Sequence, residues 1–132
     1  MDANIQTVQS MYDAFKRGDI GAIIAALTPD ADWHSGGPKR DYPPFGPRHG
    51  TKGVQEFFRQ VGESLDFQEF TPREFYANAD KVVVIGYYAM VVKNTGRKIA
   101  SDWCHIFTFQ DGKVVNFREI TDTLTIEDAY RD

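Results

Sequence analysis

The last third of the chain most restricts what it can fold into, because it contains two alternating apolar runs joined by a tight turn. Residues 98–109 and 114–122 alternate between apolar and polar side chains, which predicts two half-buried β-strands. Asp111-Gly112 between them predicts a two-residue hairpin turn. The preceding run, residues 81–92, is apolar at nearly every position and predicts a central strand that is covered on both faces. Residues 67–77 form a looser strand, and Pro72 within it predicts an edge strand or a bulge.

The first half of the chain has the spacing of helices. Apolar residues recur at i, i+3, i+4 and i+7 in residues 4–16 and again after Thr51, which can cap the second of these helices. A shorter helix is expected at residues 20–27 with Asp19 as its N-cap, and a short strand follows at residues 31–35. Residues 36–50 hold four of the six prolines, which predicts a loop long enough to form the lid or rim of a pocket.

Helices that precede antiparallel strands predict an α+β fold. With 132 residues, of which 42% are hydrophobic, we expect one domain over residues 1–132. The expected architecture is a cone-shaped, strongly bent mixed or antiparallel sheet with the N-terminal helices packed on its concave face. The interior of such a cone can hold a small ligand.

Charge and motifs exclude several classes of function. The formal net charge is -4 and neither sign forms a long run, so a nucleic-acid partner or an anionic membrane partner is not expected. The one cysteine, Cys104, lies in an apolar strand and predicts packing in a reducing compartment. No leader or membrane span is recognisable, so we expect a cytoplasmic protein. There is no phosphate-binding glycine loop, nucleophile elbow or paired-cysteine site, so neither a cofactor nor a metal is expected.

The hairpin turn predicts which side chains of its two strands share a face. If the turn has two residues, Gln110 pairs with Lys113, and His105 lies opposite Arg118. The face that would look into the cone then carries seven residues: Ser101, Trp103, His105, Phe107, Arg118, Ile120 and Asp122. Glu119 falls on the opposite face. A three-residue turn would swap the faces of one strand, and the sequence leaves that alternative open.

Three stretches resemble a known family. They are YDAFKRGDIGAIIAALTPDADWH, then HGTKGVQEFF after the proline-rich loop, and finally WCHIFTFQDGKVVNFREITDT. Together they resemble the SnoaL-like polyketide cyclases and the related ketosteroid isomerases of the nuclear transport factor 2-like superfamily, over nearly the whole chain. The resemblance implies the cone-shaped fold. It implies the reaction less closely, because this fold hosts isomerases, cyclases, hydrolases, dehydratases and binding domains.

The resemblance also implies site residues. Asp122 falls where the cyclases and the related epoxide hydrolases keep a catalytic acid, and Trp33 and Ser35 fall where the epoxide hydrolases hold their nucleophilic water. The arginine and aspartate partners of that hydrolase site would fall near Ala89 and Val91, which cannot replace them. Epoxide hydrolysis is therefore disfavoured.

Ketosteroid isomerisation by the usual residues is disfavoured as well. The isomerases' oxyanion tyrosine falls near Met11, with Tyr12 one step round the helix, and their general base falls at Ser35.

We therefore predict Asp122 as the catalytic acid or base, with a pKa raised by desolvation in the cone. Trp33, Trp103, Phe107 and Ile120 would shape the cavity, and Ser35, His105 and Arg118 would orient polar atoms of the ligand. A direct Asp122–His105 hydrogen bond is excluded by the predicted register, which separates them by roughly 13 Å. The alternative for Asp122 is a strand-end acid that caps backbone amides or faces water.

The sequence thus predicts a cofactor-free, cyclase-like or isomerase-like enzyme that acts on a small, mostly apolar or aromatic carbonyl ligand. Two alternatives stay open: a non-catalytic ligand-binding or association domain, and an epoxide hydrolase or dehydratase variant. Because both faces of the sheet are partly apolar, we expect a homodimer.

Overall fold

The computed structural model describes residues 2–36, 42 and 44–131. The described residues form four helices and six strands of an α+β fold, and two of these elements were not expected from the sequence: the strand at Gly46–His49, within the predicted loop, and the helix at Thr123–Tyr130. The helices are α1 (Ala3–Lys16), α2 (Ile20–Ala25), α3 (Gly50–Ser64) and α4 (Thr123–Tyr130). The strands are β1 (Leu27–Ser35), β2 (Gly46–His49), β3 (Leu65–Asn78), β4 (Lys81–Val92), β5 (Lys98–Gln110) and β6 (Lys113–Thr121).

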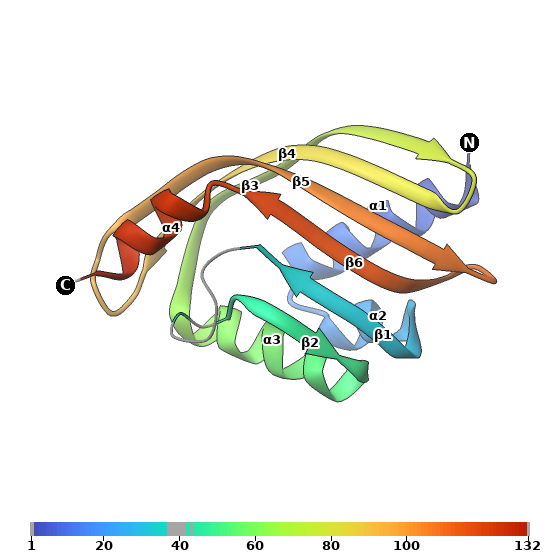
Figure 1. Ribbon diagram of the computed structural model, residues 1–132, viewed down its shortest axis with the longest axis horizontal. Coiled ribbons are helices and arrows are strands. Elements are labelled where there is room, and N and C mark those ends of the chain that lie inside the picture. The colour runs from blue at the N-terminus through green and yellow to red at the C-terminus, as the bar shows by residue number, and fades with distance from the viewer. Residues whose placement is uncertain (1, 37–41, 43, 132) are drawn as a thin grey trace.

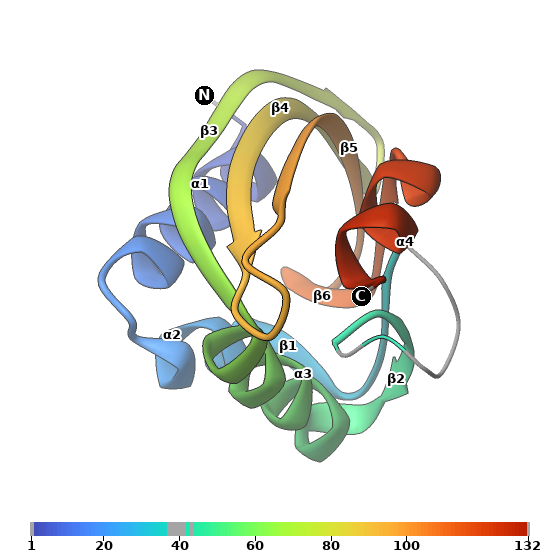
Figure 2. The same ribbon diagram turned by 90° about the vertical axis from the view of Figure 1, so that its left-hand side faces the viewer.

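The strands make one mixed sheet in the order β2-β1-β6-β5-β4-β3. The β1–β6 pair is parallel and the other neighbours are antiparallel. The sheet curls strongly without closing, as the end-on view in Figure 2 shows. The fold expected from the sequence, a strongly bent sheet with helices on its concave face, is confirmed (Figure 1).

Helices α1, α2 and α3 cover the concave side of the sheet because each has one apolar face. Val8, Met11 and Tyr12 of α1 and Val54 and Phe57 of α3 are buried in the core. Helix α2 begins with Asp19 as its N-cap, as predicted. Helix α3 begins one residue before Thr51, with His49 at the N-cap position and no side-chain capping bond.

The predicted register of the last hairpin is wrong beyond its first two pairs. The turn has two residues, and Gln110 pairs with Lys113, as expected. The ladder then shifts by one, because Phe109 pairs with Val114 while Thr108 pairs with Asn116, which leaves Val115 as the extra residue of a β-bulge. The bulge turns the rest of β6 over. Phe117, Glu119 and Thr121 now lie on the concave side.

Pro72 and Gly86 face one another across the β3–β4 ladder, where β3 is bulged. Strand β3 is also an edge strand, so both predictions for Pro72 are confirmed. A Cβ at Gly86 would lie 2.3 Å from Cζ2 of Trp103, so the absent side chain leaves room for this indole.

Helix α4 is an element that the sequence pattern did not predict. Its N-cap is Asp122, whose carboxylate accepts hydrogen bonds from the backbone N–H of Thr125 (3.1 Å) and from its hydroxyl (2.6 Å). The helix packs on β5, and Thr95 of the β4–β5 turn donates a hydrogen bond to the carbonyl oxygen of Ala129 (2.6 Å).

In the part of the chain that the structure describes, no helix is both long enough and apolar enough to cross a membrane.

Candidate functional site

The concave side of the sheet and helices α1 and α3 enclose a cavity. The space open to the centre of a water molecule measures about 80 Å³. Its wall is almost entirely apolar and strongly aromatic. The lining residues are Met11, Tyr12, Phe15, Ile23, Trp33, Ser35, Pro44, Phe45, Phe57, Phe58, Val61, Leu65, Phe67, Phe70, Tyr88, Met90, His105, Phe107, Phe117 and Glu119. An apolar pocket with a few convergent polar groups is the usual form of a small-molecule site.

The polar residues of this wall include a buried hydrogen-bonded chain. Nε2 of His105 lies 2.8 Å from Oε2 of Glu119, and the two side chains are 6% and 8% exposed. The hydroxyl of Ser35 donates to Oε1 of Glu119 (2.8 Å), and the Tyr12 hydroxyl lies 2.7 Å from Nδ1 of His105. We call Tyr12, His105, Glu119 and Ser35 the buried relay. It brings together α1, β5, β6 and β1, so the folded sheet is needed to form it.

The relay has two proton arrangements. An ionised Glu119 can only accept hydrogen bonds, so Nε2 of His105 donates to it. If His105 is neutral, Nδ1 accepts a hydrogen bond from Tyr12, and the phenol oxygen keeps free lone pairs. If His105 is protonated, Nδ1 donates to Tyr12, and the phenol O–H becomes free to donate to a ligand. One added proton on His105 therefore changes the hydrogen bond that Tyr12 can make with a ligand, from accepting one to donating one.

The surroundings keep the phenol of Tyr12 protonated. Burial raises the pKa of Tyr12 well above its ordinary value, and the Glu119 carboxylate and Cys104 raise it further. A neutral phenol can pass a proton along the relay without carrying a lasting charge in the apolar cavity.

Four of the residues predicted from the sequence line the cavity, namely Trp33, Ser35, His105 and Phe107. Trp103 is buried on the same face but lies behind the wall. Its ring stacks on His105 with 3.9 Å between centroids and on Phe70 with 5.2 Å. It fixes the imidazole plane rather than the cavity surface.

The other three predicted residues lie outside the cavity, because the bulge at Val115 turns them outward. Arg118 and Ile120 are exposed on the convex side of the sheet, and His105 faces Glu119 in place of Arg118. Asp122 is exposed, and its hydrogen bonds from Thr125 lower its carboxyl pKa, the reverse of the predicted shift. A catalytic role for Asp122 stays a prediction.

Sequence reasoning missed Tyr12 and Glu119 as site residues. The predicted register, which has no bulge, puts Glu119 on the outer face. Because Glu119 is two positions from both Phe117 and Thr121, it shares a face of β6 with them. Tyr12 belongs to the apolar face of α1 at i+4 from Val8, so its hydroxyl is carried into the core with its ring.

Comparisons with known proteins identify the family of the chain. Residues 8–117 match the model of the SnoaL-like domain. The chain belongs to the SnoaL-like domain family. No curated protein matches it.

Solved structures resemble this SnoaL-like chain over its whole length. A nuclear transport factor 2-like protein of unknown function from Burkholderia pseudomallei is 30% identical, with all of both chains covered and a TM-score of 0.90. A second from Burkholderia xenovorans is 29% identical over 98% of this chain and 96% of its own, with a TM-score of 0.88. TerC, co-crystallised with polyporic acid, is 28% identical over 97% of this chain and 98% of its own, with a TM-score of 0.85.

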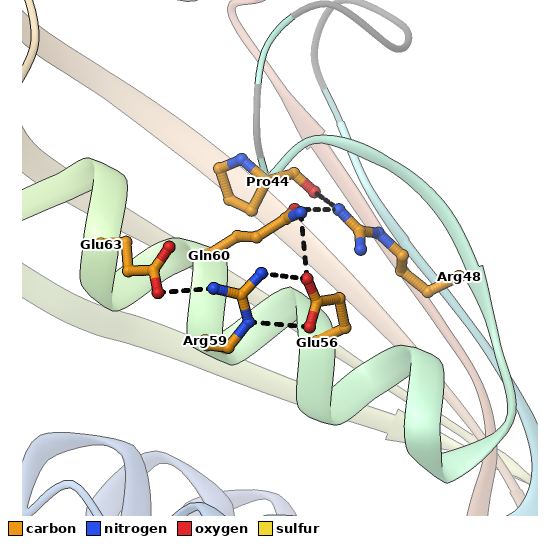
Figure 3. Close-up of polar contacts among 6 residues, drawn as sticks. All are labelled: Pro44, Arg48, Glu56, Arg59, Gln60 and Glu63. Carbon is orange, nitrogen blue, oxygen red and sulfur yellow. Dashed lines mark hydrogen bonds and ion pairs between the residues drawn. The ribbon is translucent and has the colours of Figure 1, made fainter.

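A network of hydrogen bonds and ion pairs lies at one rim of the cavity (Figure 3). Arg48 donates to the carbonyl oxygen of Pro44 (2.9 Å) and to the side chain of Gln60 on α3. Gln60 also contacts Glu56, which pairs with Arg59. Because Pro44 lines the cavity, the network ties the end of the proline-rich segment to α3. Residues 37–41 and 43 of the predicted lid lie outside the described residues.

The described residues hold no cluster of three or more His, Cys, Asp or Glu side chains placed to bind a metal ion.

Proposed function

We propose that this SnoaL-like protein is a proton-transfer enzyme of the isomerase and cyclase class. Its ligand would be a small, mostly apolar or aromatic molecule that bears a carbonyl or enol oxygen. The observation that carries the proposal is the relay of Tyr12, His105 and Glu119, which provides a proton donor and acceptor in a mostly apolar cavity.

The proposed step moves one proton between ligand and relay. The enol O–H of the ligand gives its proton to the oxygen of Tyr12, as Tyr12 gives its own proton to Nδ1 of His105. The O–H bond of the ligand breaks, an N–H bond forms on His105, and the products are an enolate and an imidazolium. Glu119 stabilises the imidazolium at 2.8 Å. Ketonisation is completed when the imidazolium returns its proton through Tyr12 to the α-carbon of the enolate, so that a C–H bond forms and the N–H bond breaks. In an intramolecular cyclisation, the same enolate carbon attacks a second carbonyl group of the ligand, and the resulting alkoxide takes the proton of the imidazolium.

The sizes of the site and ligand are consistent. A free volume of about 80 Å³ corresponds to roughly six water molecules, which is room for a one-ring or two-ring molecule. The co-crystal of TerC with polyporic acid supports a cyclic organic ligand for this fold.

The test uses 1-phenylbutane-1,3-dione, whose keto and enol forms are distinguished by ultraviolet absorption. We expect the wild-type protein to accelerate its ketonisation above the buffer rate. Glu119→Gln and Tyr12→Phe should each lower that acceleration by about 10²-fold, the usual contribution of one acid–base group. Tryptophan fluorescence should show that both variants still bind the diketone.

Matched controls separate the relay from general effects. Glu127→Gln and Tyr76→Phe change residues of the same types outside the cavity and should keep the wild-type rate. Full activity in Glu119→Gln would refute the relay. Loss of activity in Asp122→Asn alone would favour the acid predicted from the sequence. Binding without turnover in every protein would favour a ligand-binding domain.

We also propose a homodimer through the convex side of the sheet. Ile85 and Ile120 are 38% and 48% exposed on this side, with half-buried Cys104 of β5 between them and half-buried Ile106 two residues further along the same strand. A second copy would cover this partly apolar surface.

A further inference from the structure

A second hydrogen-bonded chain crosses the sheet beside the relay. The Tyr88 hydroxyl lies 2.7 Å from the Thr121 hydroxyl, which lies 3.3 Å from Oγ of Ser101. Tyr88 faces Ser101 in the β4–β5 ladder, and Thr121 comes from β6. These three residues form the hydroxyl chain.

Ser101 fixes the direction of every hydrogen bond in this chain. A serine hydroxyl has one proton to donate and two lone pairs. Its proton goes to the carbonyl oxygen of Asp102 (2.6 Å), because a carbonyl cannot donate, and one lone pair accepts the backbone N–H of Asp122 (3.4 Å). The remaining contact requires Thr121 to donate to Ser101. Tyr88 must then donate to Thr121.

Tyr88 is thereby left with lone pairs and no free proton. Its side chain is buried and lines the same cavity as the relay. Burial, helped by the nearby Glu119 carboxylate, raises the pKa of Tyr88, so the phenol stays protonated. Thr121 lies two residues from Glu119 on one face of β6, which separates the two polar positions by about 7 Å.

We propose that Tyr88 is a second binding subsite, whose oxygen accepts a hydrogen bond from a hydroxyl group of the ligand. The cavity then selects one-ring or two-ring ligands with a hydroxyl at some distance from the reacting oxygen, that is, phenols or enols rather than ethers or ketones at this position. This inference rests on the proposed function only in placing the ligand in the same cavity.

The decisive experiment measures binding by tryptophan fluorescence with 2-naphthol and its methyl ether, 2-methoxynaphthalene. The Tyr12→Phe variant is used so that the relay tyrosine cannot recognise the hydroxyl. We expect 2-naphthol to bind about 5-fold to 10-fold more tightly than the ether, as one buried hydrogen bond provides. Adding Tyr88→Phe to this variant should reduce the ratio of the affinities for 2-naphthol and its ether to about 1.

A third variant tests the direction of the chain. Ser101→Ala frees the proton of Thr121, which can then donate to Tyr88, so that the Tyr88 O–H turns toward the ligand. In the Tyr12→Phe background, Ser101→Ala should therefore bind the ketone 2-acetylnaphthalene more tightly relative to 2-naphthol. Thr121→Val should also release the O–H of Tyr88 and shift the preference in the same direction.

The proposal is overturned if the preference for 2-naphthol survives Tyr88→Phe, or if no preference exists with Tyr88 intact. If Tyr12→Phe does not fold, wild type and Tyr88→Phe are compared, and the preference for 2-naphthol should be smaller in Tyr88→Phe; an unchanged preference overturns the proposal. These outcomes are independent of the ketonisation rates, so the subsite and the proton relay can fail separately.

Discussion

Glu119 and His105 face one another across the β5–β6 ladder, with 2.8 Å between Oε2 and Nε2 and both side chains almost fully buried. Removing the carboxylate leaves the imidazole and the Ser35 hydroxyl without their partner in a dry cavity. We expect Glu119→Ala to lower the free energy of unfolding by about 3 kcal/mol. Urea denaturation measures this change in the free energy of unfolding. Glu63→Ala, at a 62% exposed side chain, is the control and should change stability by less than about 0.5 kcal/mol.

Gly86 and Gly62 predict opposite effects of the same substitution. A methyl group at Gly86 would lie 2.3 Å from the Trp103 ring and 2.7 Å from the carbonyl oxygen of Thr71, so Gly86→Ala should cost about 3 kcal/mol or more. Gly62 lies in α3, where an added methyl group would meet no heavy atom of the described residues within 4 Å apart from its chain neighbours and the nearby backbone of the helix, and Gly62→Ala should stabilise by roughly 0.5–1 kcal/mol. Thermal unfolding of the two variants compares them. Equal destabilisation would contradict the close contact with Trp103.

The capping carboxylate of Asp122 predicts how the stability of the fold changes at low pH. Because its pKa is lowered by Thr125 in the folded state, its charge stabilises the fold above the unfolded pKa of about 3.9, and this contribution is lost as pH falls through the lower folded value. Asp122→Ala should therefore destabilise at pH 7 and destabilise less at pH 2. Asp122→Asn should keep most of the stability, since asparagine caps helices well. A destabilisation that does not depend on pH would contradict the charged cap.

The buried phenols of Tyr12 and Tyr88 predict how the stability of the fold changes at high pH. Folding raises the pKa of Tyr12 and Tyr88, mainly by burial, so their contribution to stability is complete below about pH 10 and is lost as pH rises further. Unfolding measured by circular dichroism should begin at higher pH in Tyr12→Phe and in Tyr88→Phe than in the wild type. An unchanged alkaline midpoint in both variants would show that these phenols ionise without unfolding the protein.

The proposed homodimer has a direct test. Sedimentation equilibrium should give about twice the chain mass of 15.0 kDa, and Ile120→Asp should give a single chain because it places a charge on the convex side. Leu124→Asp is the control, since this 64% exposed residue lies on α4. A monomeric wild type would refute the homodimer.

Much of the fold could be predicted from the sequence, because helix and strand periods survive in single segments. Strand β4 has the predicted limits, and β5 extends one residue further than expected. The site was harder to predict. Val115 is apolar and half-buried, so the alternation before it and after it fits either face, and only pairing with β5 reveals the bulge.

Helix α4 shows a different difficulty. The sequence pattern places Asp122 at the end of a strand, and a strand-end acid and a helix N-cap are the same residue type at a similar place. Ile126, Ala129 and Tyr130 do have helical spacing, so the signal was present over a segment of only 8 residues. Tertiary contacts with β5 and the β4–β5 turn stabilise a helix of this length.

The unpaired Val115 also bears on how this scaffold diversifies. Deleting the Val115 codon would make the pairing regular and keep Glu119 opposite His105, because residues 116–121 already alternate in register with β5. Loss of the bulge with Val115 kept would instead exchange the two sides of the following strand, so that Arg118 and Ile120 would enter the interior and Glu119 would leave it. Substitutions near Val115 that favour regular pairing can therefore replace an anionic interior by a cationic one without changing any residue that lines it. In sequences aligned to this chain, the place where an extra hairpin residue bulges is thus as informative about interior chemistry as the identity of the residues that follow.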